Sequence, residues 1–536
     1  MNANARPGRT ARRVVALACL LALIQLSLGP VRAQEHTLPR VPPGFAVSVF
    51  ATVGGLPTSL AFGPSDDVGY GLMQSTMYVA DFAGGRILAI DATEGTPGPI
   101  REFASGFRNP LGVTVDDSGT VFVSDAEAPR DGPFGTRAYG RVWRLRDKDG
   151  DGVADEKKIV LKDLPNGRHN TNGLALGSDG MLYVTNGNST DDGIEGGEPE
   201  AVPWSGSVVR VDPKANEVSL TDLNRSSALI ATGMRNVYDL AFSPLDRTKL
   251  FLPTNGVDDA RPGEGGDNPT EEIEDSDDLL YATDVKDGRA DDFGFPECLY
   301  NTERQGNLRP YDNPHPEVTK KFGRCPAQSV PRPLASFGLH VSADGLAFQT
   351  TGAWGRDFRN DLFVAEFGNF FGDKIVGHQV TRVELNRAGN RVVRQGEFLS
   401  GALPLDLTFD AKGAMYVADF SGVIYRVTRI VEVPRVVEVQ MNAYQFIPQK
   451  LVIPEGTTVR WVNRDTLGLT HNVRGLAAVT ADGAGDGSRI DSKDLPVGNA
   501  HEFRFEEPGK WEYTCTINAV HTALMHGSIT VVPAGN

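Results

Sequence analysis

The stretch that decides the fold is RNPLGVTVDDSGTVFVSDA, residues 108–126. It contains a short apolar triplet, a turn rich in Gly and Asp, and an apolar strand that ends on a small or acidic residue. Six copies of this phrase lie within residues 40–428, and most are followed by a third strand such as GRVWRL or GSVVRV. Six similar units without helical periodicity are typical of an all-β, six-bladed propeller, whereas two sheets of a sandwich would not repeat in this way.

The composition agrees with a β architecture and limits the possible partners. The chain has 536 residues, with 60 Gly and 34 Pro for turns and 40% hydrophobic residues for cores. This length predicts two or three folded units. The net charge of -16 leaves no basic surface to neutralise phosphates, so we expect no nucleic-acid partner.

The N-terminus has the pattern of an export signal. Arginines between Arg6 and Arg13 precede the apolar run VVALACLLALIQLSLG, and PVRA then offers a cleavage site before Gln34. The run is shorter than the ~20 residues that a membrane span needs. We therefore predict a signal peptide at residues 1–33, a periplasmic or secreted protein and no stable membrane span; the alternative is an uncleaved anchor.

The four cysteines fall into three groups after export. Cys19 leaves with the signal peptide. Cys298 and Cys325 lie 27 residues apart in a loop-rich stretch, and an oxidising compartment favours a disulfide between them. Cys515 is left unpaired, which requires another explanation.

A calcium loop is predicted in DKDGDGVADE, residues 147–156. Its carboxylates have the oxygen-ligand spacing of an EF-hand-like loop, and Gly152 allows the sharp turn. The Glu expected at the twelfth position is missing, and the alternative is an acidic surface turn. The predicted calcium ligands are Asp147, Asp149, Asp151 and Asp155.

The repeated phrase stops after Val427, which predicts a domain boundary. A Pro-containing junction follows, and then about 100 residues of short strands, enough for one small β-sandwich. We predict a propeller at residues 34–428, a linker at 429–435 and a second domain at 436–536.

The propeller resembles the glucose/sorbosone dehydrogenase family, soluble six-bladed propellers that use pyrroloquinoline quinone (PQQ). The likeness covers roughly residues 40–428. It rests on the blade repeats and on the motifs RHNTNGLALGSDGMLYVTNG, GMRNVYDLAFSP, DDFGFPECLY and LHVSADGLAF.

The resemblance implies a catalytic site at one end of the propeller. His169 would be the general base, since an imidazole titrates near working pH. Arg235 and Asn236 would hold the quinone, because a guanidinium matches the two oxygens of a carboxylate. Backbone carbonyls around Asn255 and Gly256 would help to place a calcium ion beside it.

This chain departs from the family in its last blade. SGALPLDLTF has no arginine where the family supplies a basic residue to the acid groups of the quinone. Lys374 is the candidate replacement. The alternative for His169 is a loop histidine bonded to nearby backbone.

Soft metal ligands gather in YTCTINAVHTALMHG, residues 513–527. Type 1 copper needs two imidazoles, a thiolate and a weak axial thioether. The predicted ligands are His471, from THNV, with Cys515, His521 and Met525.

This second domain resembles a cupredoxin, the blue-copper domain of plastocyanin and amicyanin. The spacing between Cys and His is longer here, and Asn518 stands where the shorter loops place the second histidine. His526 remains an alternative axial ligand. A metal-free immunoglobulin-like sandwich is the alternative for the whole domain.

Together these features predict an exported quinoprotein dehydrogenase. It would oxidise a sugar or another alcohol or aldehyde with PQQ and pass electrons to the fused copper, and a redox protein would accept them. One alternative is a copper electron-transfer protein whose propeller is a non-catalytic binding scaffold. Another is a calcium-dependent lactonase-type hydrolase, which needs convergent carboxylates in the channel that the sequence does not locate.

Overall fold

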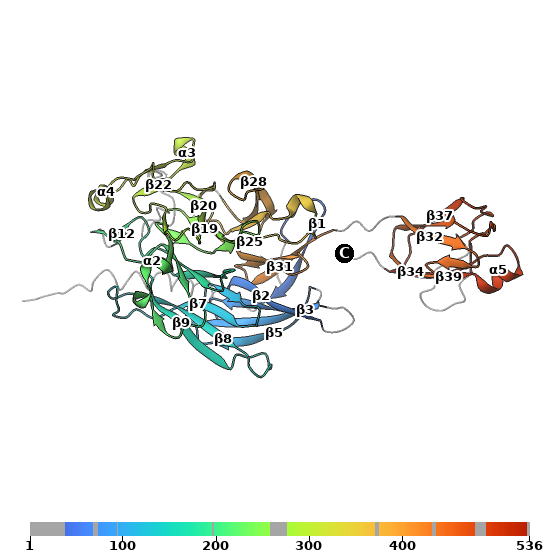
Figure 1. Cartoon of the computed structure of the whole chain (residues 1–536), viewed down its shortest axis with the longest axis horizontal. Helices are drawn as coiled ribbons and strands as arrows, with labels where there is room; N and C mark the ends of the chain where they lie inside the picture. The colour runs from blue at the N-terminus through green and yellow to red at the C-terminus, as the bar shows by residue number, and fades with distance from the viewer. Residues whose placement is uncertain are drawn as a thin grey trace, which may run out of the picture. The chain divides into compact units, whose positions relative to one another are not determined.

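The computed structural model describes residues 38–67, 73–93, 95–195, 198–257, 276–369, 375–430, 436–476 and 489–532 (Figure 1). The chain divides into two compact units, Met1–Arg429 and Ile430–Asn536. Lys374 lies outside the described residues, as does the predicted signal peptide. Within the described ranges, no helix is long and apolar enough to cross a membrane.

The first unit is built from six antiparallel blades, as the repeats predict. The first blade contains β2 (Pro57–Asp67), β3 (Met73–Asp81), β4 (Arg86–Thr93) and β5 (Thr96–Ser105). The second contains β6 (Val113–Val115), β7 (Val121–Ala126), β8 (Tyr139–Arg146) and β9 (Glu156–Pro165). The third contains β10 (Thr171–Leu176), β11 (Leu182–Asn186), β14 (Ser207–Val211) and β16 (Leu229–Thr232). The next two are β17 (Asn236–Val237) with β18 (Ala241–Phe242), β19 (Lys249–Asn255), β20 (Asp277–Asp284) and β24 (Ala335–Leu339); and β25 (Ala343–Phe348), β26 (Leu362–Glu366), β27 (Gln379–Leu385) and β28 (Val392–Ser400). The sixth has β29 (Pro404–Phe409), β30 (Met415–Asp419) and β31 (Val423–Arg429).

The sixth blade is completed by a strand from the other end of the propeller. β1 (Phe45–Thr52) pairs antiparallel with β31, from Phe45 opposite Arg429 to Thr52 opposite Val423 (Figure 1). This pairing joins the first and last blades and closes the ring. It also covers the edge of β31, whose unpaired backbone groups could otherwise bind another chain.

The apolar triplets of the repeats form the inner strands around a central channel. Residues from the inner strands of all six blades line one cavity of about 360 Å³. The cavity is bounded by Ser59–Phe62 of the first blade and Asp406–Thr408 of the last, among others. The sequence repeat thus marks the strands that surround the channel.

A carboxylate at the end of the second strand explains the acidic residue in the repeat. Asp81 accepts the backbone N–H of Leu56, just before β2, at 3.1 Å. Asp419 accepts the N–H of Leu403, just before β29, at 2.7 Å. The carboxylate therefore satisfies a backbone donor where the chain enters each of these inner strands, at a place where an unpaired donor would be costly.

Several short elements extend the blades. β15 (Val218–Ser219) pairs parallel with β9, and β21 (Asp291–Asp292) pairs parallel with β16. The disulfide between Cys298 and Cys325 is present. The remaining elements of this unit are β12 (Ile194–Glu195), β13 (Glu198–Pro199), β22 (Cys298–Tyr300), β23 (Pro310–Asp312), η1 (Leu220–Asp222), α2 (Arg225–Ala228), α3 (Thr302–Gln305), α4 (Pro316–Phe322) and η2 (Arg356–Phe358).

The second unit is a β-sandwich. One sheet contains β33 (Gln445–Ile447), β32 (Val436–Asn442), β35 (Thr457–Asn463) and β37 (Ala500–Phe505). The other contains β34 (Lys450–Pro454), β39 (His526–Val532), β38 (Gly509–Thr514) and β36 (Arg474–Gly475), and α5 (Ala519–Leu524) lies between β38 and β39 in sequence. Trp461 and Phe505 of the first sheet and Trp511 and Ile529 of the second share one buried core, which holds the two sheets together.

Candidate copper centre and propeller-top site

Two loops of the sandwich bring the predicted copper ligands together. His471 follows β35, and its backbone N–H and C=O both pair with Leu495. Cys515 follows directly on β38, and His521 lies in α5. Asn518 caps this helix by accepting the N–H groups of Val520 and His521 at 3.0 and 3.1 Å. The residue at the place of a shorter loop's histidine therefore starts the helix that carries His521.

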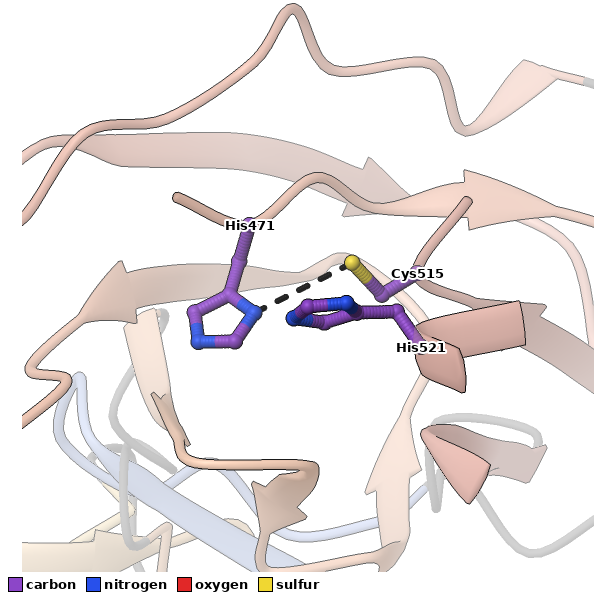
Figure 2. A group of neighbouring side chains, drawn as sticks. All are labelled: His471, Cys515 and His521. Carbon is purple, nitrogen blue, oxygen red and sulfur yellow. Dashed lines mark hydrogen bonds between the residues drawn. The ribbon is translucent and has the colours of Figure 1, made fainter. Parts of the chain in front are cut away.

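The three side chains form a buried cluster (Figure 2). The ligand atoms of His471, Cys515 and His521 all lie within 4.8 Å of one another, and Nδ1 of His471 is 3.9 Å from Sγ of Cys515. Neither ring nitrogen of His521 has a hydrogen-bond partner in the described chain. A buried imidazole without partners is costly, and a metal ion would satisfy one of its nitrogens. The cluster fits copper in its donor types and in this unsatisfied imidazole.

Surrounding groups hold the ligands in place. Nε2 of His471 bonds to Oδ2 of Asp465 at 2.8 Å, which leaves Nδ1 for the cluster. Burial alone would raise the pKa of the Asp465 carboxyl, but the bond to His471 and backbone donors lower it to about 2. The N–H of Asn472 lies 3.4 Å from Sγ of Cys515, and Oδ1 of Asn472 accepts the N–H of Thr516 at 2.7 Å. Asn472 thereby joins the two ligand loops.

The two candidate axial residues differ in burial. Met525 is fully buried in the core that contains Cys515, and its carbonyl accepts the N–H of Cys515 at 3.1 Å. His526, the next residue along the chain, is exposed. Burial and the neighbouring His471 lower the pKa of His521, which favours the neutral form that a metal requires.

His169 lies at the propeller top, the end of the channel at which the inner strand β10 begins. Its Nδ1 is 2.8 Å from the carbonyl oxygen of Asn188, so Nδ1 carries the proton and Nε2 keeps its lone pair. Burial, followed by the positive charge of Arg235, lowers the pKa of His169 to about 3. The imidazole is therefore neutral over the physiological range and can accept a proton at Nε2.

Arg235 is bound to a carboxylate that the sequence analysis missed. Its Nε donates to Oδ1 and to the backbone carbonyl of Asp191 at 2.9 and 3.0 Å, and Nη2 pairs with the same carboxylate. Burial opposes ionisation of Asp191, but Arg235 and Arg168 hold its pKa below the usual range. Nη1 of Arg235 makes no hydrogen bond within the described chain. Asp191 therefore fixes the guanidinium without using all of its donors.

Asn236 is enclosed by other amides. Its Nδ2 donates to Oδ1 of Asn255 at 2.6 Å, and its Oδ1 accepts from Asn172 at 2.9 Å. The backbone N–H of Asn188, whose carbonyl binds His169, donates to the carbonyl of Arg235 at 2.6 Å. His169, Arg235 and Asn236 therefore lie close together at the top of two neighbouring blades. A neutral imidazole, a guanidinium with an unused nitrogen and nearby amides fit an acidic quinone in kind.

The channel also contains buried carboxyls that the sequence analysis did not locate. Burial raises the pKa of Asp239 to about 7, and it raises the pKa of Asp406 above its usual range. Asp239 accepts the N–H of Leu346 at 3.2 Å and Asp406 that of Leu60 at 2.7 Å, in each case from the next blade. These carboxyls connect adjacent inner strands. The motifs YDLAF and LDLTF, with Asp before the apolar residues, are the signal that could have identified them.

The predicted calcium loop connects β8 to β9. The carboxylates of Asp147, Asp149 and Asp151 lie within 4.8 Å of one another. Asp155 instead accepts the backbone N–H of Lys148 at 2.6 Å. Gly152 has a φ of 87°, which agrees with the sharp turn expected there. The structure therefore brings three of the four predicted ligands together.

The fold and the two sites define a six-bladed propeller joined to a cupredoxin. Residues 433–532 match the family of copper binding proteins, plastocyanin/azurin family. Residues 103–234 match a domain of unknown function, DUF7133. The cupredoxin identity of the second domain and its capacity for copper follow from this match together with the ligand cluster.

Solved structures with the propeller fold include sugar-oxidising proteins. A family AA12 carbohydrate-active enzyme of Trichoderma reesei, described as a calcium structure, matches with a TM-score of 0.55 and 14% identity, over 75% of this chain and 99% of that one. The holo PQQ domain of pyranose dehydrogenase from Coprinopsis cinerea matches with a TM-score of 0.55 and 15% identity, over 75% of this chain and 99% of that one. At these identities the likeness shows the shared fold, which confirms the predicted propeller.

A curated relative matches part of the chain. An uncharacterized protein of Borreliella burgdorferi is 24% identical over 231 residues, which is 41% of this chain and 54% of that protein. The chain thus spans about half the length of the curated relative that it matches.

Proposed function

We propose that this protein is an exported quinoprotein dehydrogenase that passes electrons from a sugar, or another alcohol or aldehyde, to its own type 1 copper. The observation that carries the proposal is the buried cluster of His471, Cys515 and His521, in which the ring nitrogens of His521 have no hydrogen-bond partner among the described residues. This cluster lies in a chain whose other unit has the fold of PQQ-binding sugar dehydrogenases. The chemistry is therefore that of an oxidoreductase with copper electron transfer.

The cupredoxin residues would form a one-electron site. His471 through Nδ1, Cys515 through Sγ and His521 would supply the three strong ligands, and Met525 the weak axial one. Copper bound there supplies a one-electron carrier. Met525 is favoured over His526 because it is buried beside Cys515 whereas His526 is exposed.

The propeller residues would bind the substrate and remove its proton. His169 accepts the hydroxyl proton at Nε2, while Nδ1–H stays on the carbonyl of Asn188 and keeps the ring oriented. Arg235 offers Nη1 to an acid group of the quinone and stays anchored by Asp191. PQQ bound there would supply a hydride acceptor. The backbone carbonyls around Asn255 and Gly256 would help to hold a calcium ion. A second calcium ion is proposed for Asp147, Asp149 and Asp151, with Asp155 completing the loop.

The fusion serves the transfer of electrons between the two centres. Oxidation of an alcohol releases two electrons, whereas copper accepts one at a time. Tethering the cupredoxin to the propeller makes each transfer intramolecular and raises the effective concentration of the acceptor. Residues 1–33 would direct export, the propeller would span residues 34–428, and a linker at 429–435 would lead to the cupredoxin at 436–536. A periplasmic or extracellular redox protein would then reoxidise the copper.

The test follows the colour of the copper. The full chain is loaded with copper, calcium and PQQ and mixed with a panel of sugars and alcohols. We expect at least one substrate to bleach the copper–thiolate absorption band, and to do so only when PQQ is present. Cys515→Ser supplies the matched control, because its propeller is unchanged and its electrons can reach only an added dye.

A second candidate function is a copper electron-transfer protein on a non-catalytic propeller. It is favoured by the ion pair of Arg235, because Nε and Nη2 are already bound to Asp191 and are not available to a quinone. A titration of the full chain with PQQ in the presence of calcium separates the two. If the chain binds no PQQ, the dehydrogenase proposal is wrong and the scaffold remains.

A further inference from the structure

Asp465 has an unusual position for a carboxylate, because it is buried beside a candidate metal ligand. Its side chain has 0% exposure, as does that of His471. It lies six residues before His471, between β35 and the ligand loop. A buried carboxylate normally faces an Arg or Lys, but Asp465 faces an imidazole and backbone donors instead.

Four donors converge on the two oxygens of Asp465. Oδ2 accepts from Nε2 of His471 at 2.8 Å and from the N–H of Ala443 at 2.6 Å. Oδ1 accepts the N–H groups of Leu467 and Leu469 at 2.7 and 3.0 Å. Three of these partners are backbone N–H groups, which can only donate, so the contacts favour the anionic carboxylate and with it a proton on Nε2 of His471. The same contacts attach the ligand loop to the turn between β32 and β33.

This arrangement has two effects on His471. The bond to Nε2 fixes the tautomer in which that nitrogen carries the proton, so that Nδ1 is free for the metal. It also makes the imidazole a stronger electron donor. The second effect favours the more highly charged state of a bound metal, whereas the first makes the nitrogen available to either state.

The charge of Asp465 acts in the same direction. A site with one thiolate and one buried carboxylate is neutral when it holds a divalent ion and carries one negative charge when it holds a monovalent ion. In a buried environment that charge is poorly screened. Oxidised copper is therefore stabilised relative to reduced copper.

We infer that Asp465 is a positioning residue for His471 and that its buried carboxylate lowers the reduction potential of the copper centre. The inference rests on the proposed function, since it assumes that copper occupies the His471–Cys515–His521 cluster. Loss of a carboxylate bonded to a ligand histidine typically weakens metal binding by about 10- to 100-fold. If that loss falls on Cu(II) alone, the potential rises by about 60–120 mV, at 59 mV for each tenfold change.

The test is the reduction potential of the copper-loaded full chain and of Asp465→Asn, measured by redox titration with mediators. We expect the variant to have the higher potential by this amount. Asp494→Asn is the matched control: Asp494 accepts a bond from the side chain of Asn472 at 3.2 Å, but it is exposed, so that water screens its charge. We expect less than a twofold change in the Cu(II)/Cu(I) ratio for this control.

The outcomes separate this inference from the proposed function. If the wild-type chain takes up no copper, the copper site itself is wrong. If copper binds but Asp465→Asn leaves the potential unchanged, or if both variants shift it equally, the role of Asp465 is overturned. Should Asp465→Asn fail to load copper, the role of Asp465 is tested on the wild type in D2O, where electron–nuclear double resonance measures the exchange of the Nε2 proton of His471. Slow exchange of the Nε2 proton of His471 supports the buried bond, and exchange as fast as that of His521 refutes it.

Discussion

The two candidate sites of this molecule differ in how far the protein satisfies their polar groups. In the cupredoxin, neither ring nitrogen of the buried His521 has a hydrogen-bond partner within the part of the chain that the structure describes. At the propeller top, Arg235 is bound to Asp191, and Asn236 bonds to two other amides. A metal site keeps its ligands free, because coordination replaces hydrogen bonds. In a cofactor site, the polar side chains can be hydrogen-bonded to one another, and the cofactor must then add to these bonds or replace them.

The difference shows which half of the proposed function is more tightly constrained. Few ligands other than a soft metal ion satisfy a thiolate and two imidazoles in one buried cluster. A neutral imidazole beside an ion-paired guanidinium is compatible with many ligands and also with an empty site.

The largest effect is expected for Cys515→Ser. Removal of the thiolate should abolish the copper–thiolate absorption band completely, because a hydroxyl does not give that transition. The propeller, a separate compact unit, should retain its unfolding transition. Visible absorption and thermal unfolding of the copper-loaded chain measure both, and a band that survives would refute the copper assignment.

The next effect concerns catalysis. His169→Ala should lower kcat by ~10²–10⁴, the usual contribution of a general base. PQQ affinity should stay within a factor of a few, because Arg235 and Asn236 are unchanged. Steady-state kinetics and a PQQ titration of the same preparation check this. An unchanged kcat would make His169 a loop histidine.

A smaller and different effect is expected for Arg235→Ala. Loss of a charged hydrogen bond to a quinone carboxylate should weaken PQQ binding by about 10–150-fold, the equivalent of about 1.5–3 kcal/mol. Arg168→Ala is the control, because Arg168 also faces Asp191 but is half exposed. Equal PQQ affinities in the two variants would show that Arg235 serves only its ion pair.

The depressed pKa of His169 predicts a pH dependence of stability. Its folded pKa of about 3 lies below the ordinary value of 6.5. The unfolded chain therefore binds more protons between these values, and the propeller should lose stability as pH falls from 6.5 towards 3, by at most ~1.4 kcal/mol per pH unit. Denaturant unfolding of wild type and His169→Gln should show a flatter profile for the variant. Parallel profiles would contradict the burial of a neutral imidazole.

The smallest effect is expected for Met525→Leu. The axial ligand tunes the potential of a type 1 site without creating its colour. The absorption band should persist while the reduction potential rises, and His526→Ala should change neither. If His526→Ala shifts the potential and Met525→Leu does not, the axial assignment is reversed.

The predictable parts of this molecule are those that repeat or that carry a distinctive set of ligands. The blade phrase marks the inner strands because each blade solves the same packing problem. The predicted copper ligands stand out because Cys, His and Met are rare in the chain. Asp465 and Asp191 were missed for the opposite reason: in NRDTLGLTH and NSTDDG they look like ordinary turn residues. Their roles depend on contacts made by folded loops, with His471 and Arg235, and no local pattern encodes these.

The extra strands of two blades were missed on similar grounds. β15 and β21 are two residues long, and each pairs parallel with a strand far away in sequence. Such pairings leave no periodic signal. The caps made by Asp81 and Asp419, by contrast, lie at a fixed place in the repeat, so the sequence marks these residues although it does not show what they bind.

The pairing of β1 with β31 imposes an order on biosynthesis. Phe45 meets Arg429 across 384 residues of chain (429 - 45 = 384). While the polypeptide is being made, β1 must wait without its native neighbour until the last repeat has been synthesised, and the ring cannot close before then. Contacts of such long range slow folding and leave strand edges open to aggregation in the meantime. Whatever assists the maturation of this protein therefore has to act on a nearly complete propeller, and any cofactor that needs the closed ring can be inserted only after the last blade has been made.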